Sequence, residues 1–342
     1  MAITDKEIKE IRKALDESVR PLFFFDDDPD GTCSFVQLYR YKGEGKGIIL
    51  KAGSELREGF ARKVEEYQPD LVVILDIPLV SQDFIDQVKQ KIIWIDHHPP
   101  VKRKKIHYYN PRLHNDEDNR PTAYWAWKVA KKDLWIGMLG SVADWQLVDI
   151  KNEFAKKYPD YFDIKIQKPD DALFETKIGL LAKIVSFNLK GGVNDSMKSI
   201  KTFTRIEHPD EILKQTTPGG KYLYKKYESF NQEYKRLLND AKPTKEKLLL
   251  YIYTYSNTAV TSDLSNELLH KFPDKFILVG RIKSEEVKMS IRSATTKVHP
   301  ILMKALEEID GFGGGHDFAC GACVKERDFE RFVEIIKEEL KK

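Results

Sequence analysis

The chain has 342 residues, of which 41% are hydrophobic and 32% charged, and its formal net charge is +3. This composition excludes a disordered chain, and the length exceeds the size at which a single hydrophobic core usually keeps growing, so we expect two domains. The weak net charge excludes anion binding through a global field and leaves that task to local basic patches.

The first 19 residues have the pattern of an amphipathic helix without the apolar centre of a signal peptide, and no apolar run approaches membrane-spanning length. Three cysteines are too few for a disulfide scaffold and fit a reducing compartment. Cys320 and Cys323 form a CxxC, but without a second pair they favour packing over zinc or redox chemistry. We therefore expect a cytoplasmic protein with no membrane partner.

Short apolar runs in the first hundred residues predict strands that are buried on both faces. They cover residues 21–25, 47–50, 71–75 and 91–95. The helical spacing of Leu56, Phe60 and Val64 and an N-cap at Ser81 predict helices between the later strands. This alternation predicts an α/β fold with a parallel sheet and right-handed crossovers.

Aspartates directly follow three of these strands. They are Asp26, Asp27, Asp28 and Asp30 after residues 21–25, Asp76 after residues 71–75, and Asp96, which precedes His97 and His98, after residues 91–95. Ligands of open α/β sheets gather at the carboxyl ends of the strands, so we expect these side chains at one rim. A lone aspartate there is more often a helix N-cap, but clustered acids are costly without a cation. Carboxylates with some imidazole suit Mn²⁺ or Mg²⁺, and this many acids indicate two ions.

The segment from residue 101 to 121 is rich in charged and aromatic residues and is expected to be a loop. Its basic run, Val101 to Lys105, precedes His107, Tyr108 and Tyr109 and would either guide and stack a single strand or form a solvated face. Apolar helical patterns follow at 122–132 and 134–145, and the second presents Asp144 at its end. Residues 149–218 carry mixed signals of helices and turns.

A long helix and a second α/β unit complete the chain. Leu223, Tyr227, Phe230, Tyr234 and Leu237 recur at alternating spacings of four and three, which predicts a helix with one buried stripe that ends before Pro243. Beyond it, strand-like runs occupy 247–256, 275–280 and 287–293, and helical patterns occupy 262–272, 299–310 and 330–342.

Four motifs in order, DDDPDG, LVVILDIP, IIWIDHHPP and GSVADW, resemble those of the DHH phosphoesterase superfamily. Near the C-terminus, VKMSIRS followed by GFGGGHDFACGA resembles the DHHA1 domain of RecJ-like nucleases, nanoRNA/pAp phosphatases and cyclic-dinucleotide phosphodiesterases. The resemblance covers about residues 20–145 and 245–342. It implies a parallel-sheet DHH catalytic domain (1–215), a connecting helix and linker (216–243) and a smaller α/β DHHA1 substrate-binding domain (244–342).

Carried over residue by residue, the resemblance implies ligands for two divalent ions, with Mn²⁺ ahead of Mg²⁺ and Co²⁺. These ligands are Asp28, Asp30, Asp76 as the bridge, His97 and Asp144. Asp96 would orient the histidine pair, and His98 would contact the scissile phosphate. Several branches of the superfamily have a further histidine ligand where this chain has Phe24, so either one ion binds weakly or Asp26 replaces the missing imidazole.

On the substrate side, the resemblance implies that a nucleotide phosphate or the terminal nucleotide is held near Arg292, Ser293 and the run Gly313, Gly314, Gly315 and His316. The glycines let the backbone approach an anion closely, although such a run standing alone would favour a flexible turn. Arg292 suits a bidentate phosphate contact.

The resemblance implies a metal-dependent phosphodiesterase that acts as a single-strand-specific exonuclease on DNA or RNA. The expected 3′-to-5′ direction follows from the similarity of the two-domain architecture to archaeal nucleases, not from a residue. Two alternatives stay open: an enzyme for nanoRNA, pAp or cyclic dinucleotides, and a non-catalytic replication scaffold. Expected partners are single-stranded DNA or RNA and replication or repair proteins such as a helicase.

Overall fold

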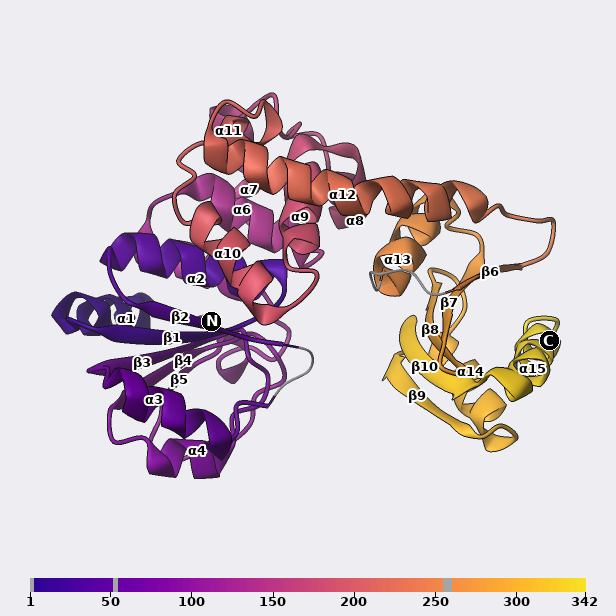
Figure 1. Ribbon diagram of the computed structural model, residues 1–342, viewed down its shortest axis with the longest axis horizontal. Coiled ribbons are helices and arrows are strands. Elements are labelled where there is room, and N and C mark those ends of the chain that lie inside the picture. The colour runs from indigo at the N-terminus through magenta and orange to yellow at the C-terminus, as the bar shows by residue number, and fades with distance from the viewer. Residues whose placement is uncertain (1–2, 52–54, 255–259) are drawn as a thin grey trace. The chain divides into compact units, whose positions relative to one another are not determined.

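The computed structural model describes residues 3–51, 55–254 and 260–342. The chain forms two compact units, Met1–Tyr227 and Glu228–Lys342, and each has its own five-stranded sheet (Figure 1). The fold is therefore α/β with a larger parallel-sheet unit and a smaller second unit, as expected. Within the described residues, no helix is long and apolar enough to cross a membrane.

The sheet of the first unit has the strand order β2-β1-β3-β4-β5, and every pairing in it is parallel. Its strands are β1 (Pro21–Asp26), β2 (Lys46–Leu50), β3 (Leu71–Leu75), β4 (Lys91–Ile95) and β5 (His107–Tyr109). Strands β1 to β4 confirm the strand predictions at residues 21–25, 47–50, 71–75 and 91–95. The prediction of a loop was wrong for β5, because three residues are too few to show a periodic pattern.

The pairing register places the ends of the central strands level with one another. Phe25 pairs with Leu75, and Leu75 pairs with Ile95. The aspartates that follow β1, β3 and β4 therefore leave the sheet at the same edge, as the parallel arrangement requires.

Helices α3 (Ala61–Tyr67) and α4 (Gln82–Gln87) lie on one side of this sheet, and α2 (Pro29–Lys42) lies on the other (Figure 1). An apolar cluster that includes Leu22, Phe24 and Trp94 fills the side of α3 and α4. Burial of such side chains contributes about 1.5–3 kcal/mol each.

The helix expected over Leu56, Phe60 and Val64 is shorter than predicted. Leu56 forms an isolated parallel bridge with Val80, and its backbone N–H donates to Leu79 at 2.9 Å, so it is not helical. The α-helix begins only at Ala61, after a 3₁₀ turn.

The remaining helices of the first unit precede β1 or follow β5. They are α1 (Asp5–Glu17), α5 (Thr122–Ala130), α6 (Leu134–Ala143), α7 (Lys151–Lys157), α8 (Pro169–Glu175), α9 (Lys177–Asn188), α10 (Val193–Phe203) and α11 (Asp210–Leu213). Helices α5 and α6 confirm the apolar helical patterns. The division between the units falls within the long helix α12 (Pro218–Asp240), which confirms the predicted helix.

The second unit has the strand order β6-β7-β8-β10-β9, in which β6 and β7 are parallel and the other pairings antiparallel. Its strands are β6 (Leu248–Thr254), β7 (Phe276–Lys283), β8 (Glu286–Ser293), β9 (Gly311–His316) and β10 (Ala319–Lys325), and its helices are α13 (Thr261–Lys271), α14 (Val298–Glu307) and α15 (Phe329–Glu339). Positions 255 and 256 of the first expected strand lie outside the described residues.

The glycine run forms a strand and not a simple turn. Gly313 to Gly315 lie in the edge strand β9, which pairs with β10.

Cys320 and Cys323 are both buried on β10, and their odd spacing directs them to opposite faces of the sheet. The two thiols therefore cannot converge on one ion or form a disulfide without rearrangement of the strand.

Candidate active site

The turn from β1 into α2 positions the first aspartates. Asp28 is the N-cap of α2, and its Oδ1 accepts from the Gly31 N–H at 2.8 Å. A Cβ at Gly31 would lie 2.8 Å from the carbonyl oxygen of Asp26, so this tight turn requires glycine. Asp28 thus has the common role of a strand-end aspartate, and its carboxylate also faces the rim.

Asp30 and Asp76 are both about 1% exposed, and both are tied to the start of α5. Asp30 accepts from the backbone N–H groups of Thr122 at 2.8 Å and Ala123 at 2.7 Å. Asp76 accepts from the Thr122 hydroxyl at 2.9 Å and adopts a left-handed backbone with φ of 61°. These bonds fix the two carboxylates while leaving other oxygen lone pairs open.

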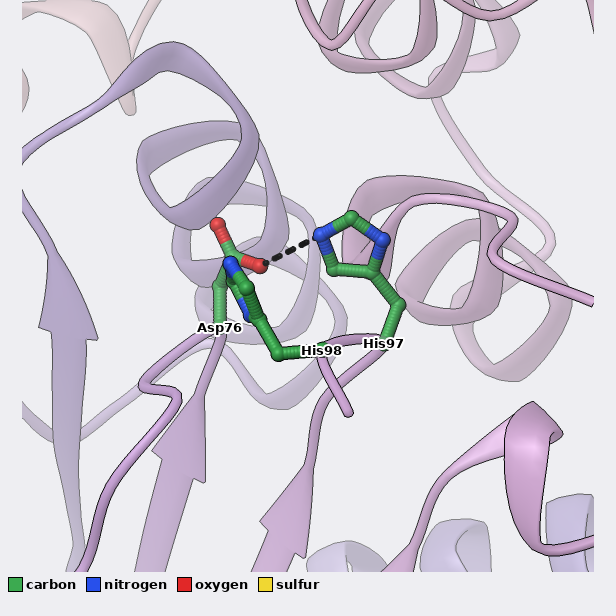
Figure 2. A group of neighbouring side chains, drawn as sticks. All are labelled: Asp76, His97 and His98. Carbon is green, nitrogen blue, oxygen red and sulfur yellow. Dashed lines mark ion pairs between the residues drawn. The ribbon is translucent and has the colours of Figure 1, made fainter. Parts of the chain in front are cut away.

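His97 has its proton placed by a backbone carbonyl. Its Nδ1 lies 2.8 Å from the Asn119 carbonyl oxygen, which can only accept, so Nδ1 donates and Nε2 keeps its lone pair in the neutral ring. Nε2 lies 3.5 Å from Asp76 Oδ1 and 3.9 Å from Asp30 Oδ2, and Figure 2 shows the ring and Asp76 pointing toward each other. A ring nitrogen so prepared, facing carboxylate oxygens, is the arrangement that a bound cation completes.

His98 is oriented by Asp96. Its Nδ1 lies 2.7 Å from Asp96 Oδ1, and the other oxygen of this fully buried carboxylate accepts from Tyr108 Oη at 3.1 Å and Asn110 Nδ2 at 3.2 Å. We expected Asp96 to orient both histidines. Instead, of the two histidines Asp96 is hydrogen-bonded to His98, whereas the His97 ring is hydrogen-bonded to the Asn119 carbonyl.

The acids at the rim repel one another. Burial, with the charge of Asp30, raises the pKa of Asp28 to about 6. Burial, with the charges of Asp30 and Asp28, raises the pKa of Asp144 to about 9 and that of Asp76 well above its usual value. Burial also raises the pKa of Asp30. So many buried carboxylates ionise together only if cations lie among them.

Two groups of side chains in the first unit have ligand atoms within 4.8 Å of one another: Asp76, His97 and His98, and Asp30, His97 and Asp144. Asp144 enters as the C-cap of α6, with Oδ2 3.8 Å from His97 Nδ1. His97 is common to both groups, and the expectation that Asp76 bridges two ions stays a prediction. Asp28 lies outside both groups, although its carboxyl group interacts with that of Asp76.

Asp26, the candidate replacement for a missing imidazole, lies at the end of β1 and outside both groups. Burial, with the charge of Asp28, raises its pKa to about 7, and it also interacts with the charge of His98. Phe24 is fully buried and packs edge-to-face on Phe60 and Phe84, within the apolar cluster. Asp27, which had no assigned role, forms an ion pair with Lys51 at 3.3 Å.

Arg292 is half-buried in the second unit and bonds only to neutral acceptors among the residues described there. Its guanidinium donates to Asn266 Oδ1 at 2.8 Å, to the Ile291 and Cys320 carbonyls at 2.9 and 3.0 Å, and to Ser262 Oγ at 3.1 Å. Burial lowers its pKa, with no carboxylate to offset the effect. A preorganised cation of this kind is suited to an anionic ligand.

The other residues expected to bind substrate, Ser293 and the run from Gly313 to His316, differ in how far they are exposed to solvent. Ser293 is buried, and its hydroxyl accepts from the N–H groups of Thr295 and Thr296, so it caps a turn. His316 and Gly315 are exposed on the edge strand, and Gly313 and Gly314 are half-buried. A Cβ at Gly314 would meet nothing within 4 Å, whereas one at Gly315, with φ of 145°, would lie 2.3 Å from the Ala319 carbonyl oxygen.

Sequence reasoning missed the residues that hold the site in place. Thr122 binds two of the acids, Asn119 sets the proton of His97, and Tyr108 and Asn110 hold Asp96. The contact from Asn119 is a backbone carbonyl, which leaves no trace in a sequence. Tyr108 and Asn110 follow Asp96 closely enough to be considered as partners, but only the β4–β5 pairing directs them to it.

Comparison with protein families decides the relationship. The family model described as "DHH family, N-terminal domain" matches residues 22–150, and the model for the DHHA1 domain matches residues 246–342. The chain belongs to the DHH/DHHA1 superfamily. The DHH match contains all the acids and both histidines of the rim, and the DHHA1 match contains Arg292 and the glycine-rich strand. A search of curated proteins gave no match.

Several solved structures share the fold. RecJ from Thermus thermophilus in complex with Mn²⁺ matches with a TM-score of 0.65 at 15% identity, over 99% of this chain and 55% of that one. The chain thus spans about half the length of that RecJ. CDC45 from Entamoeba histolytica matches with a TM-score of 0.56 at 9% identity, over 99% of both chains. The pGpG-specific phosphodiesterase PggH from Vibrio cholerae matches with a TM-score of 0.52 at 13% identity, over 94% of this chain and 98% of that one. At these identities, the likeness is one of a phosphoesterase-type and nuclease-type fold.

Proposed function

We propose that the protein is a metal-dependent phosphodiesterase that removes nucleotides from single-stranded DNA or RNA in the 3′-to-5′ direction. The observation that carries this proposal is the convergence of buried carboxylates on an imidazole nitrogen, His97 Nε2, whose proton is held on the opposite side of the ring. A set of several carboxylates and one imidazole suits Mn²⁺, with Mg²⁺ and Co²⁺ as alternatives. The fold shared with Mn²⁺-bound RecJ supports this choice.

The proposed ligands are Asp28, Asp30, Asp76, His97 and Asp144, with Asp26 as an additional acid beside Asp28. Two divalent ions bound there would activate a water for in-line attack on phosphorus and offset the charge of the phosphoryl oxygens. The start of α5 fixes Asp30 and Asp76, so these ligands need little rearrangement. This preorganisation lowers the cost of binding.

His98 is proposed to contact the scissile phosphate. Burial opposes its protonation, but the hydrogen bond and charge of Asp96 prevail and raise the pKa of His98. The ring can therefore carry a positive charge and donate from Nε2 to a phosphoryl oxygen while Asp96 holds Nδ1. Arg292 and the glycine-rich strand are proposed to hold a nucleotide phosphate of the substrate, because the guanidinium has no acidic partner among the described residues.

The expected result with Mn²⁺ is a ladder of products from oligonucleotides labelled at either end, ranging from dinucleotides to long strands of either sugar. Retention of a 5′ label on progressively shorter products indicates 3′-to-5′ removal. The variant His97→Ala loses an inner ligand, so its rate falls by at least about 10²-fold, the upper end of the loss seen for mere supporting residues. His107→Ala is the matched control, because His107 is exposed on β5 and outside the rim.

Each alternative has its own result in this assay. Activity confined to the shortest substrates contradicts the exonuclease and favours a phosphodiesterase for small nucleotides, the activity named for PggH. Unchanged hydrolysis in His97→Ala contradicts the assigned site. A wild type that hydrolyses nothing with Mn²⁺ but binds a partner protein favours the replication scaffold, and the shared fold of CDC45 keeps that candidate in the test.

The variant Gly314→Ala tests whether the substrate contacts the edge strand β9 without changing the stability of the fold. Open space around Gly314 accommodates a methyl group, so we expect an unchanged melting temperature and a higher KM where the substrate approaches the backbone. Gly315→Ala is the contrasting variant: its strained φ and the clash with Ala319 cost about 1–3 kcal/mol of stability. Thermal melts and steady-state kinetics of both variants check this, and an unchanged KM in Gly314→Ala argues against close approach there.

A further inference from the structure

A basic groove opens on the first unit along the segment that follows His98 in the chain. It has a volume of about 870 Å³ and is lined by the segment from Pro100 to Lys105, by Tyr108, and by Gln82 and Asp86 of α4. The lining begins two residues after His98 in the chain. The groove therefore borders the segment that carries the catalytic histidines.

The charges of this groove are poorly balanced. Four consecutive cations, Lys102 to Lys105, face a single lining carboxylate, Asp86, which pairs with Lys105 at 2.9 Å. The Arg103 guanidinium donates to two backbone carbonyls, of Val80 at 2.5 Å and of Lys102 at 2.9 Å. Lys102 and Lys104 are exposed, and Asp86 interacts with the charge of Lys104 as well as with that of Lys105, so the described lining has one carboxylate for four cations. This surface therefore suits a ligand with several negative charges.

Tyr108 joins the groove to the active site. Its ring stacks on Trp94 with centroids 3.9 Å apart, and its hydroxyl donates to Asp96, the residue that orients His98. Tyr109 is buried, and Tyr108 has one face of its ring on Trp94 and its hydroxyl on Asp96, so the other ring face is what Tyr108 presents to the groove. The lining residues thus offer four cations and one half-buried ring, which favours contact with phosphates over contact with bases.

We propose that this groove binds the sugar-phosphate backbone of a single-stranded nucleic acid beside the catalytic rim, independently of base sequence. The proposal rests on the proposed function and narrows its substrate to strands of several nucleotides, because a dinucleotide seated at the metals has too few phosphates to fill the groove as well. Lys102 and Lys104 are the contacts most exposed to the strand. Neutralising them should weaken binding and reduce its dependence on salt.

The test measures binding of fluorescent oligothymidylate and oligouridylate of about 20 nucleotides to metal-free protein over a series of NaCl concentrations. For K102Q/K104Q, the negative slope of log K against log salt should become shallower by about 1.4, that is, by about 0.7 for each lost phosphate contact. The control K9Q/K132Q removes the same charge from exposed positions outside the groove and should keep the wild-type slope. The two oligonucleotides distinguish a preference for DNA or RNA.

A second measurement compares the Mn²⁺-dependent rates on the same oligonucleotides and on a dinucleotide. The ratio of the long-strand rate to the dinucleotide rate should fall in K102Q/K104Q and stay at the wild-type value in K9Q/K132Q. An unchanged salt slope or an equal loss in the control overturns the groove proposal. A wild type that hydrolyses neither substrate while the groove variant still loses strand affinity overturns the proposed function and leaves the groove in place.

Discussion

Replacing Asp76 by Asn is expected to abolish Mn²⁺-dependent hydrolysis and to raise the melting temperature of the metal-free protein. Asp76 is about 1% exposed and faces the charges of Asp30 and Asp28, so its ionisation without a cation is costly. The amide removes that charge. Its oxygen can still accept from the Thr122 hydroxyl, and Asn tolerates the left-handed backbone at this position.

The two effects must occur together for the interpretation to hold. Activity should fall by at least about 10²-fold, because a ligand is lost rather than a supporting residue. In thermal melts, Asp76→Asn should have a higher melting temperature than the wild type in chelator. Its melting temperature should rise less than that of the wild type when Mn²⁺ is added. Asp116→Asn, at an exposed position, is the control and should change neither. A variant that keeps the full Mn²⁺-induced rise would show that Asp76 is not a ligand.

The stability of the metal-free protein is expected to fall as the pH rises from about 5 to 9. The pKa values of Asp28, Asp26 and Asp144 are raised from 3.8 to about 6, about 7 and about 9, with burial the largest cause for each. In this window the native state holds protons that the unfolded chain has released, so unfolding is favoured by rising pH. Each carboxyl costs about 1.4 kcal/mol per pH unit between its unfolded and folded pKa. The raised pKa of His98 acts in the same direction, since its stabilisation is lost as the ring deprotonates.

Bound Mn²⁺ should reverse this trend, because the ionised carboxylates then stabilise the complex. Urea unfolding at pH 5, 7 and 9 measures how the free energy of unfolding changes with pH, once in chelator and once with Mn²⁺. The Asp76→Asn variant should show a shallower fall than the wild type in chelator. A metal-free stability that is flat or increases toward pH 9 would contradict the clustering of buried, mutually repelling acids at the rim.

The parallel sheet was predictable because strands buried on both faces have continuous apolar sequences, as residues 71–75 and 91–95 do. The rim followed from topology, since an aspartate directly after a parallel strand must emerge at its carboxyl end. Short or bridging segments were not predictable. Strand β5 and the bridge at Leu56 depend on neighbours far along the chain, and three residues or one carry no periodic signal.

The sequence by itself determined the superfamily, the α/β class and which acids and histidines gather at one edge, because these depend on motif order and strand direction. Only the tertiary structure decided how each group is held: Asn119 sets the tautomer of His97, Thr122 fixes Asp30 and Asp76, and the glycine run is a paired edge strand. Hydrogen bonds of this kind require residues up to 93 positions apart to meet. Their geometry is set by packing of the whole domain, which no local pattern of residues encodes.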